Sequence, residues 1–218
     1  MYTFSYANAK YINTDEDLIF VRKLQLSDEL LRKVDQLDSG DYTWYVSGKD
    51  PGDDFHNGFI KLSTIYDEKT TQYVNELHQA LFDLSYHEFL KIDPQGKLIS
   101  KVRGFISWSH SRNKMMPATP HCDSTTVGDW TFLIQVKGTS GATVFLDNSR
   151  NRQVIKAVDF DPMTLVIFPS IYSHQGLLPI DSTDRYIVNF VSTIETSMNE
   201  KILSKSPDII QRLAQTGE

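Results

Sequence analysis

The stretch WTFLIQVKGTSGATVFLDN (residues 130–148) decides the fold, because it contains two short strand signals on either side of a turn signal. Residues 130–138 and 142–148 are rich in β-branched and aromatic side chains, and the TSG segment between them is typical of a turn. Similar runs occupy 98–108, 152–160, 164–170 and 185–193. Roughly seven or eight short strands at this spacing predict an antiparallel sandwich or barrel.

Two segments before these strands have helical periodicity. Residues 27–40 begin with Ser27 as an N-cap and end at Gly40, and residues 70–90 repeat apolar side chains at helical spacing. The apolar positions are Leu30, Leu31, Val34 and Leu37 in the first segment, and Val74, Leu77, Leu81 and Leu84 in the second. The expected fold is therefore mainly β with supporting helices, in the form of a double-stranded β-helix, or jelly roll.

A single domain is expected over residues 1–218, because no repeat, low-complexity tract or linker divides the chain. We expect N-terminal strands and supporting helices over 1–95, a jelly-roll core over 96–195 and a helical tail over 196–218. Within the tail, Ser206 and Pro207 resemble a helix start. The polar, aromatic loop at 40–58 could be a lid or an ordinary surface connection, and the sequence does not separate the two.

The composition is that of an ordinary soluble globular protein, with 40% hydrophobic and 23% charged residues. No run approaches the length of a membrane helix, and the N-terminus lacks a basic region followed by an apolar one. With a single cysteine, Cys122, no intramolecular disulfide or thiolate pair is expected, which favours a cytoplasmic location. The formal charge of −6 argues against broad nucleic-acid binding as a function. Oligomeric state is not indicated.

A second stretch, TPHCDSTTVGDW (119–130), contains candidate metal ligands. If it is extended, His121 and Asp123 point to one side and Cys122 to the other. His174 follows the apolar strand at 164–170, and an antiparallel roll can bring it beside His121. Two histidines and a carboxylate form the facial triad that suits non-haem Fe(II), with open positions for a chelating cosubstrate and O2. Arg185, on the next strand, would suit a distal carboxylate of that cosubstrate.

These residues, in this order on a β-rich pattern, resemble the Fe(II)- and 2-oxoglutarate-dependent dioxygenases, in particular the prolyl 4-hydroxylase-like group. The resemblance covers residues 98–193 and rests on the HCD motif, His174 and Arg185. It implies that His121, Asp123 and His174 hold Fe(II), that 2-oxoglutarate chelates the metal, and that Arg185 binds its distal carboxylate. Residues 135–148 would correspond to a glycine-containing hairpin of the family. Asp123 favours oxygenation over halogenation, because related halogenases lack this carboxylate.

Two amides are further candidates for the cosubstrate pocket. Asn189 should share a strand face with Arg185, and Gln135 lies on the strand after the HCD motif. Either could hydrogen-bond the bound acid or satisfy neighbouring backbone. The remaining histidines, which lack metal spacing, are expected to be structural or solvent-facing; they are His56, His78, His87 and His110.

The predicted function is a hydroxylase that oxidises a prolyl, other peptidyl or small-molecule C–H bond and releases succinate and CO2. The prolyl substrate follows only from the resemblance, because fold and cosubstrate do not determine what the open end of the pocket binds. The alternative from another class is a non-catalytic jelly-roll module with a ligand-binding or structural role. A nucleic-acid demethylase of the same superfamily is a lesser alternative, disfavoured by the acidic charge.

Overall fold

The computed structural model describes residues 14–42, 58–61, 67–110, 120–147, 152–177 and 184–205. Its strands form a six-stranded sheet, in the order β1-β7-β4-β9-β3-β2, and a three-stranded sheet, in the order β6-β5-β8. The strands are β1 (Phe20–Lys23), β2 (Gly58–Lys61), β3 (Lys97–His110), β4 (Asp129–Lys137), β5 (Ala142–Leu146), β6 (Val154–Asp159), β7 (Thr164–Pro169), β8 (His174–Leu177) and β9 (Asp184–Glu195).

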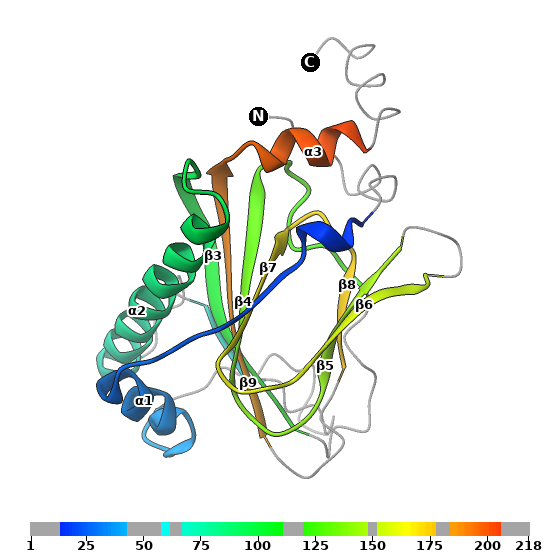
Figure 1. The fold of residues 1–218 in the computed structure, drawn as a ribbon. Helices are drawn as coiled ribbons and strands as arrows, with labels where there is room; N and C mark the ends of the chain where they lie inside the picture. Colours follow the sequence, from blue (N-terminus) through cyan, green and yellow to red (C-terminus); the bar gives the residue numbers. More distant parts are fainter. Residues whose placement is uncertain are drawn as a thin grey trace.

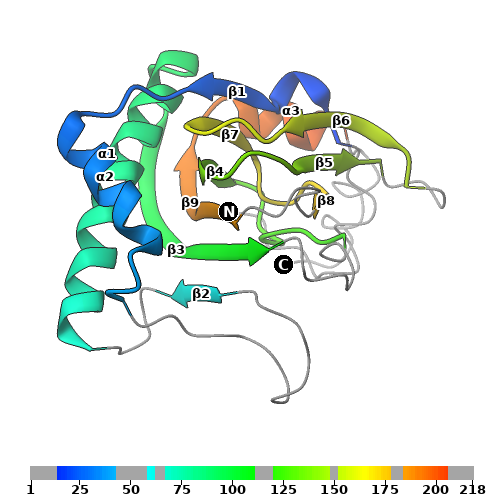
Figure 2. The same ribbon diagram turned by 90° about the horizontal axis from the view of Figure 1, so that it is seen from below.

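Every pairing among the described strands is antiparallel, and the two sheets face each other (Figure 1). The helices are α1 (Asp28–Asp35), α2 (Glu68–Ile92) and α3 (Met198–Ser204), with 3-10 turns at Glu16–Leu18 and Gln36–Asp38. Seen from below, α1 and α2 lie outside the larger sheet, on the side away from the smaller one (Figure 2). This arrangement confirms the predicted jelly roll with supporting helices. The last strand, β9, lies in the middle of the larger sheet, between β4 and β3.

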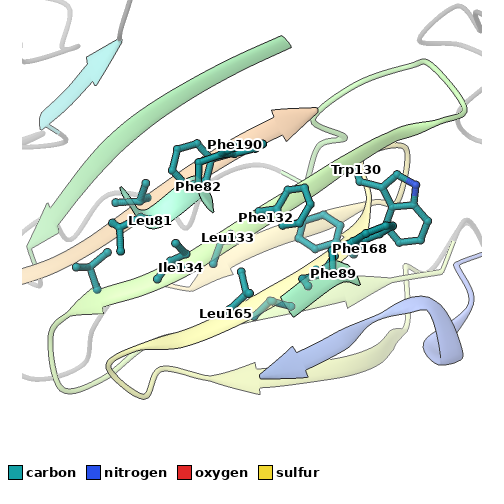
Figure 3. Close-up of a cluster of buried hydrophobic side chains, with 14 of the residues drawn as sticks. Leu81, Phe82, Phe89, Trp130, Phe132, Leu133, Ile134, Leu165, Phe168 and Phe190 are labelled. Atoms are coloured by element: carbon teal, nitrogen blue, oxygen red, sulfur yellow. The ribbon is translucent and has the colours of Figure 1, made fainter. Parts of the chain in front are cut away.

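Helix α2 forms the main hydrophobic contact with the outer face of the larger sheet (Figure 3). Its N-cap is Asp67, whose carboxylate accepts a hydrogen bond from the Thr70 amide at 2.9 Å. Phe82 packs edge-on against Phe190 at 5.5 Å between ring centroids, and Phe89 packs in the same way against Trp130 at 5.3 Å. The inner face of the larger sheet is thereby left to face the smaller sheet.

Helix α1 begins as predicted but buries a narrower stripe. The Ser27 hydroxyl accepts a hydrogen bond from the Leu30 amide at 3.3 Å, and Leu30, Val34 and Leu37 are buried. Leu31 is 39% exposed, so the predicted stripe is wrong at this position. The helix is short, and Leu31 lies about 100° round the axis from Leu30, on a side that does not reach the sheet.

Residues 135–148 do not form the expected hairpin, because the two strands belong to different sheets. β4 pairs with β7 and β9, whereas β5 pairs with β6 and β8. All of β5 and all of β4 except Lys137 are buried, so each strand needs neighbours on both edges and cover on both faces. The connection therefore crosses between sheets, with Gly138 and Gly141 at φ +139° and +106°, values that favour glycine.

Some elements differ from the sequence-based expectation, and some predictions concern residues that the structure does not describe. Strand β8 was not predicted, whereas helix α3 lies within the helical tail expected over 196–218, before the start expected at Ser206. The expected helix start at Ser206 and Pro207, His56, and most of the 40–58 loop lie outside the described residues. In the part of the chain that the structure describes, none of the helices is both long and apolar enough to cross a membrane.

Candidate metal centre

A short backbone bridge brings the two candidate histidines together. The His121 amide donates to the His174 carbonyl at 3.0 Å, and the His174 amide donates to the His121 carbonyl at 2.9 Å. The Asp123 amide donates to the Ser170 carbonyl at 2.9 Å, which fixes the next side chain on the same face. One ligand atom from each of His121, Asp123 and His174 lies within 4.8 Å of the others. The structure thus brings together the three residues that the sequence singled out.

Side chains from three strands of the larger sheet hold the Asp123 carboxylate. Thr131 Oγ1 on β4 donates to Oδ2 at 3.0 Å, and Asn189 Nδ2 on β9 donates to the same oxygen at 3.2 Å. Arg103 Nη2 on β3 donates to Oδ1 at 2.6 Å. Burial alone would raise the pKa of Asp123, but His174, Arg103 and Asn189 lower it below its usual value. Asp123 is therefore a carboxylate at neutral pH.

His174 is oriented as a metal-binding imidazole. Its Nδ1 lies 3.1 Å from the Tyr172 carbonyl oxygen, which favours a proton on Nδ1 and leaves Nε2 facing Asp123, 3.6 Å from Oδ2. Burial lowers the pKa of His174, so the ring is neutral at pH 7 and can act as a ligand. The His121 side chain is 41% exposed, whereas those of Asp123 and His174 are only 2% and 4% exposed. The centre is therefore open to solvent on the His121 side.

Arg185 lies on the inner face of β9 and is buried. Its Nη1 donates to the Leu177 carbonyl at 2.6 Å, and its guanidinium carbon lies 5.1 Å from the centre of the Phe160 ring. Burial lowers the pKa of Arg185 to about 10, so it stays charged at neutral pH. Among the described residues no carboxylate pairs with it. A buried cation without a counter-charge is costly, and an anionic ligand would offset that cost.

Four buried polar atoms have no hydrogen-bond partner among the described residues and belong to strands around the inter-sheet space: Gln135 Nε2, Thr143 Oγ1, Arg185 Nε and Asn189 Oδ1. Two of these residues were candidates from the sequence. Asn189 uses its amide nitrogen on Asp123, and Gln135 uses its oxygen to accept from the Asp161 amide at 2.8 Å. Three of the four atoms can donate a hydrogen bond, so they suit the carboxylate of an acid bound beside Arg185.

Gly176 lies next to Arg185 on the strand that begins with His174. It follows His174 by two residues on β8, so both positions belong to the same face of the strand. A Cβ added at Gly176 would lie 3.8 Å from Arg185 Nη1. The donor set of two imidazoles and a carboxylate at one end, and a buried guanidinium at the other, fits Fe(II) with a small dicarboxylic acid.

Comparison by sequence gives no relatives, since no protein-family model and no curated protein matches the chain. Comparison of the structure does. The α-ketoglutarate-dependent carbocyclase SnoK of nogalamycin biosynthesis is 13% identical at a TM-score of 0.55, over 87% of this chain and 84% of SnoK. A 2OG-Fe(II) oxygenase family protein from Burkholderia pseudomallei is 13% identical at 0.56, over 87% and 91% of the two chains. The chain has the fold of the 2-oxoglutarate/Fe(II) oxygenases.

The same oxygenase fold occurs in a Trichoplax adhaerens prolyl hydroxylase solved with a hypoxia-inducible factor peptide. That protein is 13% identical at a TM-score of 0.52, with 88% of each chain covered. A carbocyclase and a peptide hydroxylase thus share one architecture. The oxygenase fold therefore does not determine the reaction or the substrate, which depend on the residues of the site.

Two residues that hold the centre in this oxygenase fold were missed from the sequence. Thr131 could have been found, because it is four residues before Gln135 on the same strand and so points to the same face of the sheet. Arg103 could not, because an arginine in an alternating strand is usually solvent-facing, and its neighbour in space depends on the pairing of β3 with β9. Of the other histidines, His78 is buried beside Phe190 and His87 is exposed, as expected, while His56 and the side chain of His110 lie outside what the structure describes. Burial raises the pKa of Cys122 to about 11, so it remains a thiol.

Proposed function

We propose that the protein is an Fe(II)- and 2-oxoglutarate-dependent oxygenase that hydroxylates a C–H bond and releases succinate and CO2. One observation carries the proposal. The ligand atoms of His121, Asp123 and His174 lie within 4.8 Å of one another, and the sheet that orients Asp123 also carries the buried cation Arg185. His121, Asp123 and His174 would hold Fe(II), and the metal with 2-oxoglutarate supplies the activation of O2.

The chain's own residues provide binding, orientation and a dry environment. Arg185 binds the distal carboxylate of 2-oxoglutarate, and the unpaired donors of Gln135 and Thr143 can add hydrogen bonds to the same acid. The rings of Phe145 and Phe168 pack edge-on at 4.8 Å, and Phe168 lies 4.9 Å from the His174 ring. These aromatic side chains exclude water from the side of the centre that is away from its opening.

The substrate is a prolyl or other peptidyl group, or a small molecule, that reaches the centre from the His121 side. This side is where the ligands are accessible, since Asp123 and His174 are covered by protein. The fold of a peptide hydroxylase and of a small-molecule carbocyclase supports both substrate sizes. The acidic composition of the chain disfavours a nucleic-acid substrate.

Anaerobic titration with Fe(II) and then 2-oxoglutarate tests the proposal. We expect the weak visible charge-transfer band of the chelate in the wild-type protein, and no band in Asp123→Ala. In Arg185→Gln, metal binding should persist while 2-oxoglutarate affinity falls roughly 10- to 100-fold, the range for losing a hydrogen bond to a charged group. Asp17→Ala and Arg22→Gln, which change the same charges at exposed positions, serve as matched controls.

The titration distinguishes the oxygenase from a non-catalytic jelly-roll module. A non-catalytic jelly-roll module would give no band at any concentration of 2-oxoglutarate. If Asp123→Ala and Arg185→Gln both bind metal and acid like the wild type, the assigned residues are wrong. Succinate formed in air with peptide and metabolite panels then narrows the substrate.

A further inference from the structure

Arg103 lies on the open side of the candidate metal centre. It is on β3, opposite Val191 of β9, and its Nη2 donates to Asp123 Oδ1 at 2.6 Å. Its side chain is 43% exposed, close to the 41% of His121, whereas the Asp123 side chain between them is 2% exposed. A molecule that approaches the centre from solvent therefore meets Arg103 and His121 first.

The two arginines of the site lie at opposite ends of the metal centre. Asn189, which contacts Asp123, is four residues after Arg185 on β9, or about 13 Å along the strand. Arg103 is opposite Val191, which is two residues after Asn189 and therefore lies on the side of Asn189 away from Arg185. Arg185 is buried and matches a small acid enclosed between the sheets. Arg103 is left for a group that comes from outside.

Asp123 is the one carboxylate that contacts Arg103 among the described residues. The other carboxylate near this end, Asp129, already accepts hydrogen bonds from Ser124 and Thr193. A metal ion bound by Asp123 would share the negative charge with which Arg103 pairs. The guanidinium would then face solvent beside a metal ion, with two or more donors free for a new anion.

We propose that Arg103 binds a carboxylate of the substrate, so that the enzyme acts on free carboxylic acids whose oxidised carbon lies near the acid group. The inference rests on the proposed function and specifies its substrate class. The planar guanidinium forms paired hydrogen bonds with a carboxylate, and the Phe105 ring, whose centre is 5.8 Å from the guanidinium carbon, offers an apolar surface next to it.

Metal binding gives a test that does not depend on turnover. Co(II), a redox-inert substitute in such sites, is titrated calorimetrically into wild-type protein, Arg103→Gln and Lys101→Gln. Lys101 is the matched control, because it is two residues away on β3 and its ammonium lies 4.1 Å from the Phe82 ring centre, on the α2 side of the sheet. Removing the cation beside the metal should tighten Co(II) binding roughly three- to tenfold in Arg103→Gln only.

Substrate class is tested with matched acids and amides. Protein saturated with Co(II) and 2-oxoglutarate is titrated with N-acetylproline and N-acetylprolinamide, and with 3-phenylpropanoic acid and its amide. The saturating 2-oxoglutarate keeps the probes from Arg185. We expect the wild type and Lys101→Gln to bind one or both of the acids roughly tenfold or more tightly than the matching amide. In Arg103→Gln, the affinities for each acid and its amide should agree within about twofold.

The outcomes separate this inference from the proposed function. If wild-type protein fails to bind Co(II) and 2-oxoglutarate, the proposed function itself is wrong. If it binds both, three results overturn only the role of Arg103: Co(II) affinity unchanged or weaker in Arg103→Gln, an acid preference that survives in Arg103→Gln, or no acid preference in the wild type. Loss of 2-oxoglutarate binding in Arg103→Gln would assign this arginine to the cosubstrate instead, and would also overturn the proposal.

Discussion

Asp123 is held by neutral donors on one oxygen and by a cation on the other. Thr131 and Asn189 both donate to Oδ2, and Arg103 donates to Oδ1. The neutral donors orient the carboxylate without competing for its charge. Thr131 is itself held by Ser170, whose Oγ lies 2.8 Å from its hydroxyl. Because the single Thr131 proton goes to Asp123, the Ser170 hydroxyl donates to Thr131.

Thr131→Val should weaken metal binding by roughly tenfold while leaving the fold intact, because valine has nearly the same shape but cannot orient Asp123. Co(II) titration measures the effect. Thr131→Ser, which keeps the hydroxyl, should restore most of the affinity. Equal affinity in wild type and Thr131→Val would show that Asn189 and Arg103 alone position the carboxylate.

Two ligands of the site could be predicted from the local chain alone. The alternation of an extended backbone placed His121 and Asp123 on one side, and the structure brings them together. The contact between Arg103 and Asp123 depends on the register of β3 against β9, with Arg103 opposite Val191. That register follows from packing across the whole sheet, so local sequence did not reveal it.

Helix α2 contributes a buried titratable group to the outer face of the larger sheet. His78 is 2% exposed, and its ring lies 5.1 Å from that of Phe190. The position of Gly104 is also tight, since a Cβ there would lie 3.2 Å from His78 Nδ1. Burial lowers the pKa of His78 from 6.5 to about 4, so the ring is neutral in the folded protein at neutral pH.

This lowered pKa predicts acid sensitivity. Below pH 6.5 the unfolded chain protonates His78 while the folded protein does so only near pH 4, so the unfolded state binds more protons in this window. Stability therefore falls as the pH drops from 6.5 towards 4, and this residue accounts for about 2 kcal/mol between pH 7 and 4.5. Urea unfolding of wild type and His78→Leu at both pH values measures the difference. A loss of the same size in both proteins would contradict the assignment.

Elements with strong periodicity could be predicted, and those defined by neighbours could not. The strands at 98–108 and 185–193 and the helix at 70–90 carry enough apolar side chains to be recognised alone. Strand β8 has four residues, one of them glycine, and exists because His174 to Leu177 pair with β5. The turn signal at TSG correctly marks a reversal, but it does not say whether the chain returns to the same sheet.

At the scale of the molecule, the candidate metal centre connects the two sheets. His174 begins β8 of the smaller sheet, while Asp123 is oriented from β4, β9 and β3 of the larger one. A bound metal would link these sheets across the interior. A ligand that binds the folded state but not the unfolded state stabilises the folded protein by mass action.

Metal at about 100 times its dissociation constant should therefore raise stability by about 2.7 kcal/mol, and the melting temperature by roughly 5 to 10 °C for a chain of this length. Thermal unfolding with Co(II), followed by excess chelator, measures the rise and its reversal. Asp123→Ala should show no change with Co(II). A similar rise in that variant would place the stabilising ion elsewhere.

The central position of β9 sets a condition on biosynthesis. This strand is the last of the nine that the structure describes, yet it pairs with both β3 and β4, which do not pair with each other. A nascent chain that ends before residue 184 exposes two long, unpaired strand edges, which favour intermolecular association. Arg185 and Asn189 arrive with the same strand. The ribosome must therefore release the chain through Glu195 before either the larger sheet or the binding site can be completed.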